Sequence, residues 1–254
     1  MSDRVLCSVQ HGIARITLNR PEKRNALDRE MVAGIRQALA ETAENSEVRV
    51  VVLTGAGKDF CSGADLAALQ QMQEAGVMEH LSDAHRMADL FLDMRRHPRL
   101  IIAIVRGRAL AGGCGVATAA DIVLAEESAQ FGYTETKIGF VPAIVMAILR
   151  RSVNERRALE LLATGEIIPA RAALELGMIN RVYPDADFNS CVDAYVTSLA
   201  SKSATALSMT KSLLYEMDGM SFEASIEAGA QANALARQTD DFKRGVERFL
   251  KKQP

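Results

Sequence analysis

Residues 109–140 of the chain read ALAGGCGVATAADIVLAEESAQFGYTETKIGF, and this stretch decides how the rest is interpreted. It opens with a glycine pair, Gly112 and Gly113, at a point where a strand turns into a helix. It closes with one carboxylate, Glu135, which follows a short strand and has Lys137 as its only basic neighbour. A carboxylate at the end of a buried strand is a candidate general base. Alternatively, Glu135 is a solvated loop residue without a catalytic role.

The glycine pair indicates a site for developing negative charge. Glycine allows a positive φ and a close approach of a ligand, and the first amides of a helix have no partner within it. The segment FCSGAD around Gly63 and Ala64 has the same character, because it leaves a strand and opens a helix. Amides from both places would form an oxyanion hole if they converge, and losing one donor from such a hole costs about 3 kcal/mol. The alternative for the pair is a simple turn.

The pattern along the chain predicts an α/β fold. Short apolar runs predict buried strands over 5–10, 13–18, 49–55, 100–105, 121–125 and 178–183. Amphipathic runs predict helices over 28–44, 80–96, 154–165 and 169–177. The apolar faces of the first two helices carry Met31, Ile35, Ala38 and Leu39, and Leu81, Ala84, Ala88, Phe91 and Leu92. The ββα order divides the chain into a core, residues 1–190, and a helical region, residues 191–254, that docks against it.

The composition is typical of a globular protein. The chain has 254 residues, of which 48% are hydrophobic and 24% charged, so a sizeable core can form without disulfides or metals. The net charge of −2 favours neither nucleic acid nor an acidic membrane as a partner. No run reaches about 18 apolar residues, and the first residues have no signal-peptide pattern. We therefore expect a cytoplasmic protein without nucleic-acid or membrane partners.

Several other site types are excluded by their missing motifs. The cysteines show no CxxC and are expected to be reduced and mostly buried: Cys7, Cys61, Cys114 and Cys191. The histidines show no ligand spacing, so we expect no metal site and a surface position for each: His11, His80, His85 and His97. The segment GGCGVAT lacks the third glycine of a dinucleotide-binding turn. No GxSxG or Walker motif occurs, which argues against an α/β-hydrolase and a P-loop enzyme.

Four segments, taken together, resemble the enoyl-CoA hydratase/isomerase family, also called the crotonase superfamily. They are NRPEKRNAL (19–27), VVVLTGAGKDFCSGADL (50–66), the stretch at 109–142 and LLATGEIIPARAALELGMINRV (161–182). The resemblance extends from about Val5 to Leu250. It implies a spiral of ββα units with a helical C-terminal trimerisation region, assembled as a homotrimer or as a hexamer of two trimers. It also implies an acyl-CoA thioester substrate and no cofactor, since coenzyme A is part of the substrate.

The resemblance also implies roles for individual residues. The amides of Ala64 and Gly112 would hold the thioester oxygen as it becomes an enolate, with Glu135 as the acid and base. The positions that match the family's coenzyme A contacts are Arg24, Ala26, Ala64, Asp65, Leu66, Gly112, Phe249 and Lys252. The last two would cover a site from a neighbouring helix.

The chain departs from the hydratase pattern at one position. Hydratases of this family hold one water between two glutamates, and the place of the first is taken here by Gly115. One carboxylate can still move a proton between two carbons, as an isomerase does, or hydrate if another group orients the water. Glu79 and Asp83 are candidates for that group, and Tyr133 and Thr134 flank the base. Methionines on the helix faces either shape an acyl pocket or pack in the core: Met72, Met78, Met87 and Met94.

The leading hypothesis is an enoyl-CoA hydratase, extending to a branched or carboxylated enoyl-CoA such as methylglutaconyl-CoA. The second hypothesis is an enoyl-CoA delta-isomerase that uses Glu135 alone. The third hypothesis is an acyl-CoA decarboxylase or thioester hydrolase. Such an enzyme needs the same oxyanion hole but depends less on a pair of acids. The non-enzymatic hypothesis is a binding module that has the same scaffold without catalysis.

Overall fold

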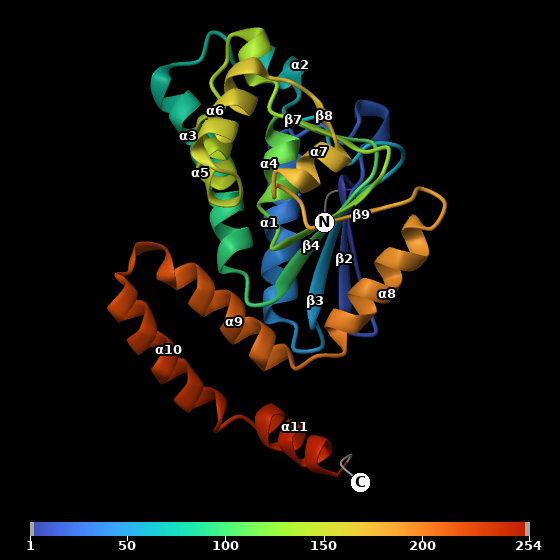
Figure 1. Ribbon diagram of the computed structural model, residues 1–254. Helices are drawn as coiled ribbons and strands as arrows, with labels where there is room; N and C mark the ends of the chain where they lie inside the picture. The colour runs from blue at the N-terminus through green and yellow to red at the C-terminus, as the bar shows by residue number, and fades with distance from the viewer. Residues whose placement is uncertain (1–2, 252–254) are drawn as a thin grey trace.

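The computed structural model describes residues 3–251 of the chain (Figure 1). Its strands are β1 (Val5–Gln10), β2 (Ile13–Leu18), β3 (Val50–Gly55), β4 (Leu100–Val105), β5 (Arg108–Leu110), β6 (Ile122–Glu126), β7 (Gln130–Gly132), β8 (Ile168–Pro169) and β9 (Arg181–Tyr183). Its α-helices are α1 (Arg29–Glu44), α2 (Leu66–Gln71), α3 (Val77–Arg96), α4 (Gly112–Thr118), α5 (Ala143–Ser152), α6 (Glu155–Thr164), α7 (Ala170–Glu175), α8 (Phe188–Ala200), α9 (Ala204–Glu216), α10 (Phe222–Ala236) and α11 (Asp240–Leu250). Short 3-10 turns are η1 (Pro21–Lys23), η2 (Glu135–Ile138) and η3 (Met217–Gly219).

Two sheets organise the core. The larger one has six strands in the order β1-β2-β3-β4-β6-β9, and the smaller one has three in the order β5-β7-β8. Only β1 runs antiparallel to its neighbour in the larger sheet, because a tight turn at His11 and Gly12 joins it to β2. The other pairs of that sheet are parallel and are joined by crossovers. The predicted α/β class and the early ββα order are confirmed.

The larger sheet is buried on both faces, which explains its continuous apolar strands. On β3, Val51 and Leu53 pack into the main core with α1 and α3, whereas Val50 and Val52 face a second core. Helix α8 covers this second face with Phe188, Val192, Val196 and Ala200. The expected boundary at residue 190 therefore falls inside α8, a helix that belongs to the packing of the sheet.

The predicted buried face is confirmed for helix α1 and only partly for helix α3. Asp28 caps α1 by accepting from the Met31 amide, and the expected Met31, Ile35, Ala38 and Leu39 are all buried. On α3 the buried residues are Leu90, Phe91 and Met94, whereas the expected Leu81 and Leu92 are exposed. Phe91 is therefore confirmed, whereas the first half of α3 buries no residue and the core-facing side of its second half passes through Leu90 and Met94 instead of Leu92.

The C-terminal helices differ in how they contact the core. The described chain from Phe188 onward is helical, as expected, and α8 and α9 pack against the larger sheet. Helices α10 and α11 bury no residue, and Figure 1 shows them extending away from the body of the molecule. The expected docked region is therefore docked only through α8 and α9 within one chain.

Candidate active site

The smaller sheet brings the two halves of the site together. Strands β5 and β7 run parallel, with Leu110 opposite Gly132. The Ala111 amide then donates to the Gly132 carbonyl at 2.7 Å, which extends this pairing by one residue. Helix α4 begins at the next residue, Gly112, and Glu135 follows β7 on η2. The adjacent carboxyl ends of two parallel strands thus place the start of α4 beside the turn that carries Glu135.

The loop before α2 meets the start of α4. A Cβ built on Gly63 would lie 2.8 Å from the Ala111 Cβ and 3.5 Å from the Gly112 nitrogen, so only glycine allows this approach. The Leu27 amide donates to the Gly63 carbonyl at 2.7 Å and fixes the loop from the other side. Within the described part of the chain, the backbone N–H groups of Ala64 and Gly112 donate no hydrogen bond. The two expected oxyanion donors are therefore close in space and unpaired.

The backbone at this junction is strained. Ala111, the residue before α4, has φ 48° and ψ −130°, a conformation that residues with a side chain rarely adopt. Strained backbone of this kind costs about 1–3 kcal/mol and persists where the surrounding structure enforces it, often at a functional site. Here the pairing of Ala111 with Gly132 and the packing against Gly63 enforce it. Helix α4 begins at the residue directly after this strained position.

Glu135 is a buried carboxylate with a free oxygen. The residue is 9% exposed, and its Oε2 is buried without a hydrogen-bond partner. Burial is the main influence on the carboxyl group and raises its pKa above the usual value for glutamate. A buried acceptor without a partner is destabilising unless a ligand supplies a donor. A raised pKa and an unpartnered oxygen are properties that a general base requires.

Behind Glu135, a buried tyrosine joins β7 to α4. The Tyr133 hydroxyl lies 2.8 Å from Thr118 Oγ1, which in turn donates to the Cys114 carbonyl at 2.9 Å. Burial keeps the pKa of Tyr133 well above its usual value. The phenol thus stays protonated and holds the helix that carries Gly112 at a fixed distance from the turn that carries Glu135. In the sequence Tyr133 stands two residues before Glu135, but no local pattern indicates this bridge.

The expected coenzyme A contacts lie on the loop before α1 and at the start of α2. Arg24 is exposed and has a left-handed backbone, and Ala26 is buried. Leu66 is 63% exposed, whereas the Asp65 carboxylate is already engaged by Arg20 at 2.6 Å. The Asp65 amide also donates to the Leu27 carbonyl at 2.9 Å, so both its side chain and its backbone are engaged within the protein.

Asn25 is the residue of this loop that sequence reasoning missed. It is fully buried with a positive φ, and its side-chain amide donates to the Ala56 and Asp59 carbonyls at 2.9 and 2.8 Å. Its Oδ1 accepts from the Arg20 amide at 2.8 Å. The signal that could have found it is an asparagine between two basic residues and an apolar run, a place where asparagine tolerates left-handed backbone.

Several other candidates are not brought to this site. Phe249 lies on α11, at the end of the molecule far from α4 and α5 (Figure 1), and is 68% exposed. Lys252 lies outside the described residues. Glu79 accepts from the Gly76 amide at 3.0 Å, and Asp83 pairs with Arg86 at 2.7 Å. Each of these acids therefore has a partner in the N-terminal part of α3.

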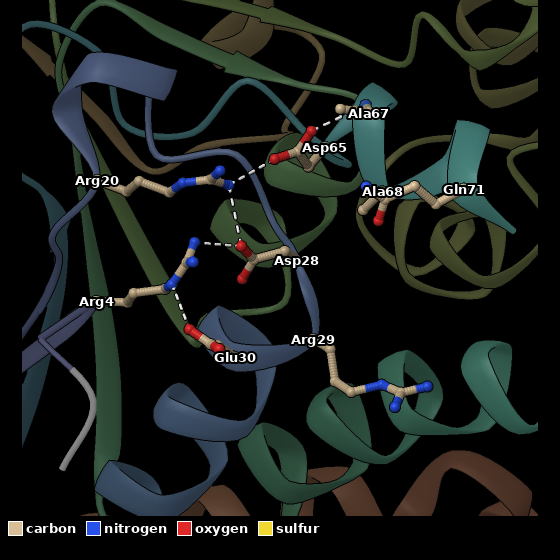
Figure 2. A pocket seen from close by; sticks show the side chains of 9 residues that line it. All are labelled: Arg4, Arg20, Asp28, Arg29, Glu30, Asp65, Ala67, Ala68 and Gln71. Carbon is tan, nitrogen blue, oxygen red and sulfur yellow. Dashed lines mark hydrogen bonds and ion pairs between the residues drawn. The ribbon is translucent and has the colours of Figure 1, made fainter.

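A hollow of about 330 Å³ lies beside α2 and is shown in Figure 2. Its walls hold three arginines and three acids. Arg4 and Arg20 point toward the acids, with Arg20 bonded to both Asp65 and Asp28, whereas the Arg29 side chain points away from them. These groups neutralise one another, so the hollow offers no net charge to a ligand. Neither Glu135 nor Gly112 lines it. Its residues are Arg4, Arg20, Asp28, Arg29, Glu30, Asp65, Ala67, Ala68 and Gln71.

Comparisons with known proteins identify the family. Residues 8–254 match the family model described as Enoyl-CoA hydratase/isomerase. The chain belongs to this family. It is 42% identical over 250 residues to a protein of Thermus thermophilus provisionally named enoyl-CoA hydratase, covering 98% of this chain and 99% of that one. It is 31% identical to (E)-benzylidenesuccinyl-CoA hydratase of Thauera aromatica, with 96% and 95% of the two chains covered.

Solved structures of family members have the same fold. The chain superposes on Pseudomonas aeruginosa AtuE with a TM-score of 0.94 at 30% identity, covering 98% of this chain and 97% of that one. A Mycobacterium smegmatis enoyl-CoA hydratase matches with a TM-score of 0.92 at 31% identity, covering 98% and 96%. The expected crotonase-type fold with its helical C-terminal region is confirmed, and the protein is an enzyme of the enoyl-CoA hydratase/isomerase family.

The sulfur and histidine side chains mostly confirm their expected structural roles in this enzyme. Burial raises the pKa of both Cys61 and Cys114 to about 12, so neither thiol is a nucleophile near neutral pH. Met94 is fully buried in the core, whereas Met87 reaches to 3.7 Å from a Cβ built on Gly112. The expectation for His97 is wrong: it is 4% exposed and contacts Thr42, and burial lowers its pKa to about 4.

Residues 3–251 contain no group of three or more His, Cys, Asp and Glu that could hold a metal ion. Over the same residues, no helix combines the length and the hydropathy needed to cross a membrane.

Proposed function

We propose that this enzyme hydrates a 2-enoyl-CoA thioester, with Glu135 as the only acid and base. The observation that carries the proposal is the buried, unpartnered Oε2 of Glu135 beside two unpaired backbone amides. The amides of Ala64 and Gly112 are suited to a thioester oxygen that gains negative charge. The carboxylate is suited to proton transfer because burial raises its pKa toward neutrality.

The residues define a balanced sequence of steps. Glu135 takes a proton from a water molecule while the water oxygen attacks C3 of the enoyl group. The π electrons of the C2–C3 bond move toward the carbonyl, and the enolate oxygen is held by the amides of Ala64 and Gly112. Glu135 then gives its proton to C2, which restores the thioester carbonyl. Atoms and charge balance, and the carboxylate ends as it began.

Names of relatives support the direction and widen the substrate class. The Thauera aromatica relative is named for hydration of (E)-benzylidenesuccinyl-CoA, which bears a second carboxyl group. By analogy, the substrate here extends to a branched or carboxylated enoyl-CoA, with methylglutaconyl-CoA as one example. Arg24, Ala26, Asp65 and Leu66 would lie along the coenzyme A portion.

A second candidate function is delta-isomerisation of a 3-enoyl-CoA. The specific observation that favours it is Gly115, which leaves Glu135 without a partner carboxylate. In this reaction Glu135 removes a proton from C2 and returns it to C4, while the double bond moves from C3–C4 to C2–C3. Decarboxylation or thioester hydrolysis, and binding without turnover, are the outcomes that remain if both reactions fail.

The assembly and location of the enzyme are part of the same proposal. Residues 1–190 would form the acyl-CoA-binding core, and residues 191–254 would mediate assembly into a homotrimer or a hexamer. The exposed apolar side chains of α10 and α11 support this division. Phe249 and Lys252 would then reach the site of a neighbouring subunit. The enzyme would work in the cytoplasm without a cofactor and without nucleic-acid or membrane partners.

The first prediction concerns Glu135→Gln. The substitution keeps the shape of the side chain and removes its basicity, so we expect turnover to fall about 10²–10⁴-fold, the usual contribution of a general acid or base. The measurement follows the absorbance of the conjugated thioester with crotonyl-CoA and with a 3-enoyl-CoA, in deuterated water. Loss of conjugation from crotonyl-CoA indicates hydration, and a gain from the 3-enoyl substrate alone indicates isomerisation.

The exposed Glu74→Gln serves as the matched control for this assay. Its turnover should equal that of the native chain. If Glu135→Gln keeps full activity on both substrates, Glu135 is not the acid and base. Bound coenzyme A thioester without turnover by the native chain would instead favour the decarboxylase, hydrolase or non-catalytic alternatives.

A further inference from the structure

Gly115 has no room for a side chain. It is buried on α4, three residues after Gly112. A Cβ built there would overlap the Val145 Cγ1 methyl and lie 3.3 Å from both Val145 Cβ and Phe91 Cζ. Cβ atoms in proteins do not tolerate such an overlap, so any larger residue at this position requires helix α5 or its side chains to move.

The space beside Gly115 is filled by apolar groups. Val145, in the first turn of α5, is 5% exposed, and Phe91 on α3 is 8% exposed. Neither side chain can donate or accept a hydrogen bond, so this wall cannot orient a water molecule. Among the described residues, the two candidate acids on α3 have other partners: Glu79 accepts from the Gly76 amide and Asp83 pairs with Arg86. The second carboxylate is therefore not merely absent: its place is occupied.

We propose that Val145, supported by Phe91, is a specificity-determining residue of this enzyme. Its side chain takes the volume that a carboxylate at position 115 would need, and so confines acid–base chemistry to Glu135. The inference rests on the proposed function, because it concerns the balance between two reactions that one carboxylate and one oxyanion hole can support. Val145 acts on that balance through packing and is not itself a catalytic residue.

The balance follows from what each reaction needs. Hydration passes through a 3-hydroxy enolate and isomerisation through a dienolate, and the same amides and the same carboxylate serve both intermediates. Hydration additionally needs a water oxygen held at C3, whereas isomerisation needs only that Glu135 reach both C2 and C4. An apolar wall in place of a second carboxylate leaves the water with Glu135 alone. The wall therefore lowers the rate of hydration relative to isomerisation.

The decisive experiment compares Gly115→Glu, Val145→Ala and the double variant. Hydration of crotonyl-CoA and isomerisation of a 3-enoyl-CoA are measured on each preparation, and their ratio is the readout. We expect Gly115→Glu alone to lower Tm by about 5 °C or more, because the new side chain overlaps Val145. The double variant should regain stability and raise the ratio of hydration to isomerisation at least about tenfold over the native ratio.

A packing measurement keeps the inference testable if the double variant folds poorly. Gly115→Ala should destabilise the native chain and should do so much less in the Val145→Ala background, which a double-mutant cycle detects. Val192→Ala, at an equally buried valine on α8, is the matched control. It should lower Tm without changing the ratio and without coupling to position 115.

Two results would overturn the inference. One is a stable Gly115→Glu enzyme whose ratio already equals that of the double variant, since Val145 would then be no obstacle. The other is an absence of coupling between positions 115 and 145. Failure of the proposed function looks different: the native chain would turn over neither substrate, while the coupling between positions 115 and 145 would still be measurable.

Discussion

At the scale of single residues, the site concentrates groups that are costly to the fold. Ala111 has a strained backbone, and the Glu135 carboxylate is buried without a partner for Oε2. Gly63 and Gly115 stand where a Cβ would collide with neighbours. These features gather where β5 and β7 end, as expected when a fold sacrifices stability to hold reactive groups in place. The buried side-chain amide of Asn25 stabilises the loop before α1 by donating hydrogen bonds to the Ala56 and Asp59 carbonyls.

The burial of Glu135 predicts a pH-dependent effect on stability. Because burial raises the pKa of the carboxyl group in the folded state, folding favours its protonated form. That stabilisation is present below the unfolded pKa and is lost as the pH rises through the folded pKa. At pH 7, Glu135→Gln should therefore be more stable than the native chain by about 1 kcal/mol, the low end of the cost of a buried unpaired group.

Urea unfolding at a series of pH values measures this difference. It should shrink as the pH falls toward 4 and below, where the native carboxyl group is itself protonated. Glu74→Gln, at an exposed loop position, provides the comparison and should show no such trend. A native chain that is more stable than Glu135→Gln at pH 7 would mean that the carboxylate has a partner in solution. The same raised pKa places the acidic limb of the pH–rate profile above the usual range for glutamate.

At the scale of elements, short strands and helix ends do more for the site than the long helices. The pairing of β5 with β7 spans three residues on each strand, yet it fixes both the start of α4 and the position of η2. Helix α9 is held at the opposite end of α4 by a buried network. Lys211 donates to Asp121 at 2.8 Å and to the Met94 and Arg99 carbonyls, and the Tyr215 hydroxyl donates to Asp121 at 2.6 Å.

Lys211→Met tests this network. Both charged side chains are at least nine-tenths buried, so removing one leaves the Asp121 carboxylate without its counter-charge. Breaking a buried pair in this way costs about 3–5 kcal/mol. A lower urea midpoint with an unchanged m-value is the expected result. The exposed Lys202→Met provides the control, and a loss below about 1 kcal/mol for Lys211→Met would show that α9 is held by its apolar contacts instead.

At the scale of the whole molecule, one chain leaves a large apolar surface without cover. Phe222, Ile226 and Leu235 on α10 are 77%, 60% and 66% exposed. On α11 the apolar residues recur at helical spacing and are also exposed: Phe242, Val246, Phe249 and Leu250. Surfaces of this kind mark sites of association, which supports the proposed assembly through the C-terminal helices.

A chain that ends at residue 220 tests this assembly. It lacks α10 and α11, which bury no side chain within one protomer, so its core should stay folded. We expect the full chain to sediment as a trimer or a hexamer and the shortened chain as a monomer with a similar circular dichroism spectrum. Analytical ultracentrifugation makes the comparison. A full chain that sediments as a monomer at micromolar concentration would contradict the proposed assembly.

The sequence by itself determined the class of the fold and most of its strands, and it predicted Glu135 as the candidate base. These features depend on local rules: the period of apolar residues, the hydrogen bonds of a helix end and the freedom of glycine. The resemblance of four segments determined the family, because their order and spacing are specific together. The missing partner carboxylate at Gly115 was also visible in the sequence.

Only the tertiary structure decided what surrounds these residues. The buried face of α3, the burial of His97 and the internal ion pair of Asp65 depend on which elements pack together, and no local pattern contains that information. The same holds for Gly115, whose neighbours Phe91 and Val145 lie 24 and 30 residues away in sequence (115 − 91 and 145 − 115). A sequence can show that a carboxylate is missing, but contacts between distant segments decide what fills its place.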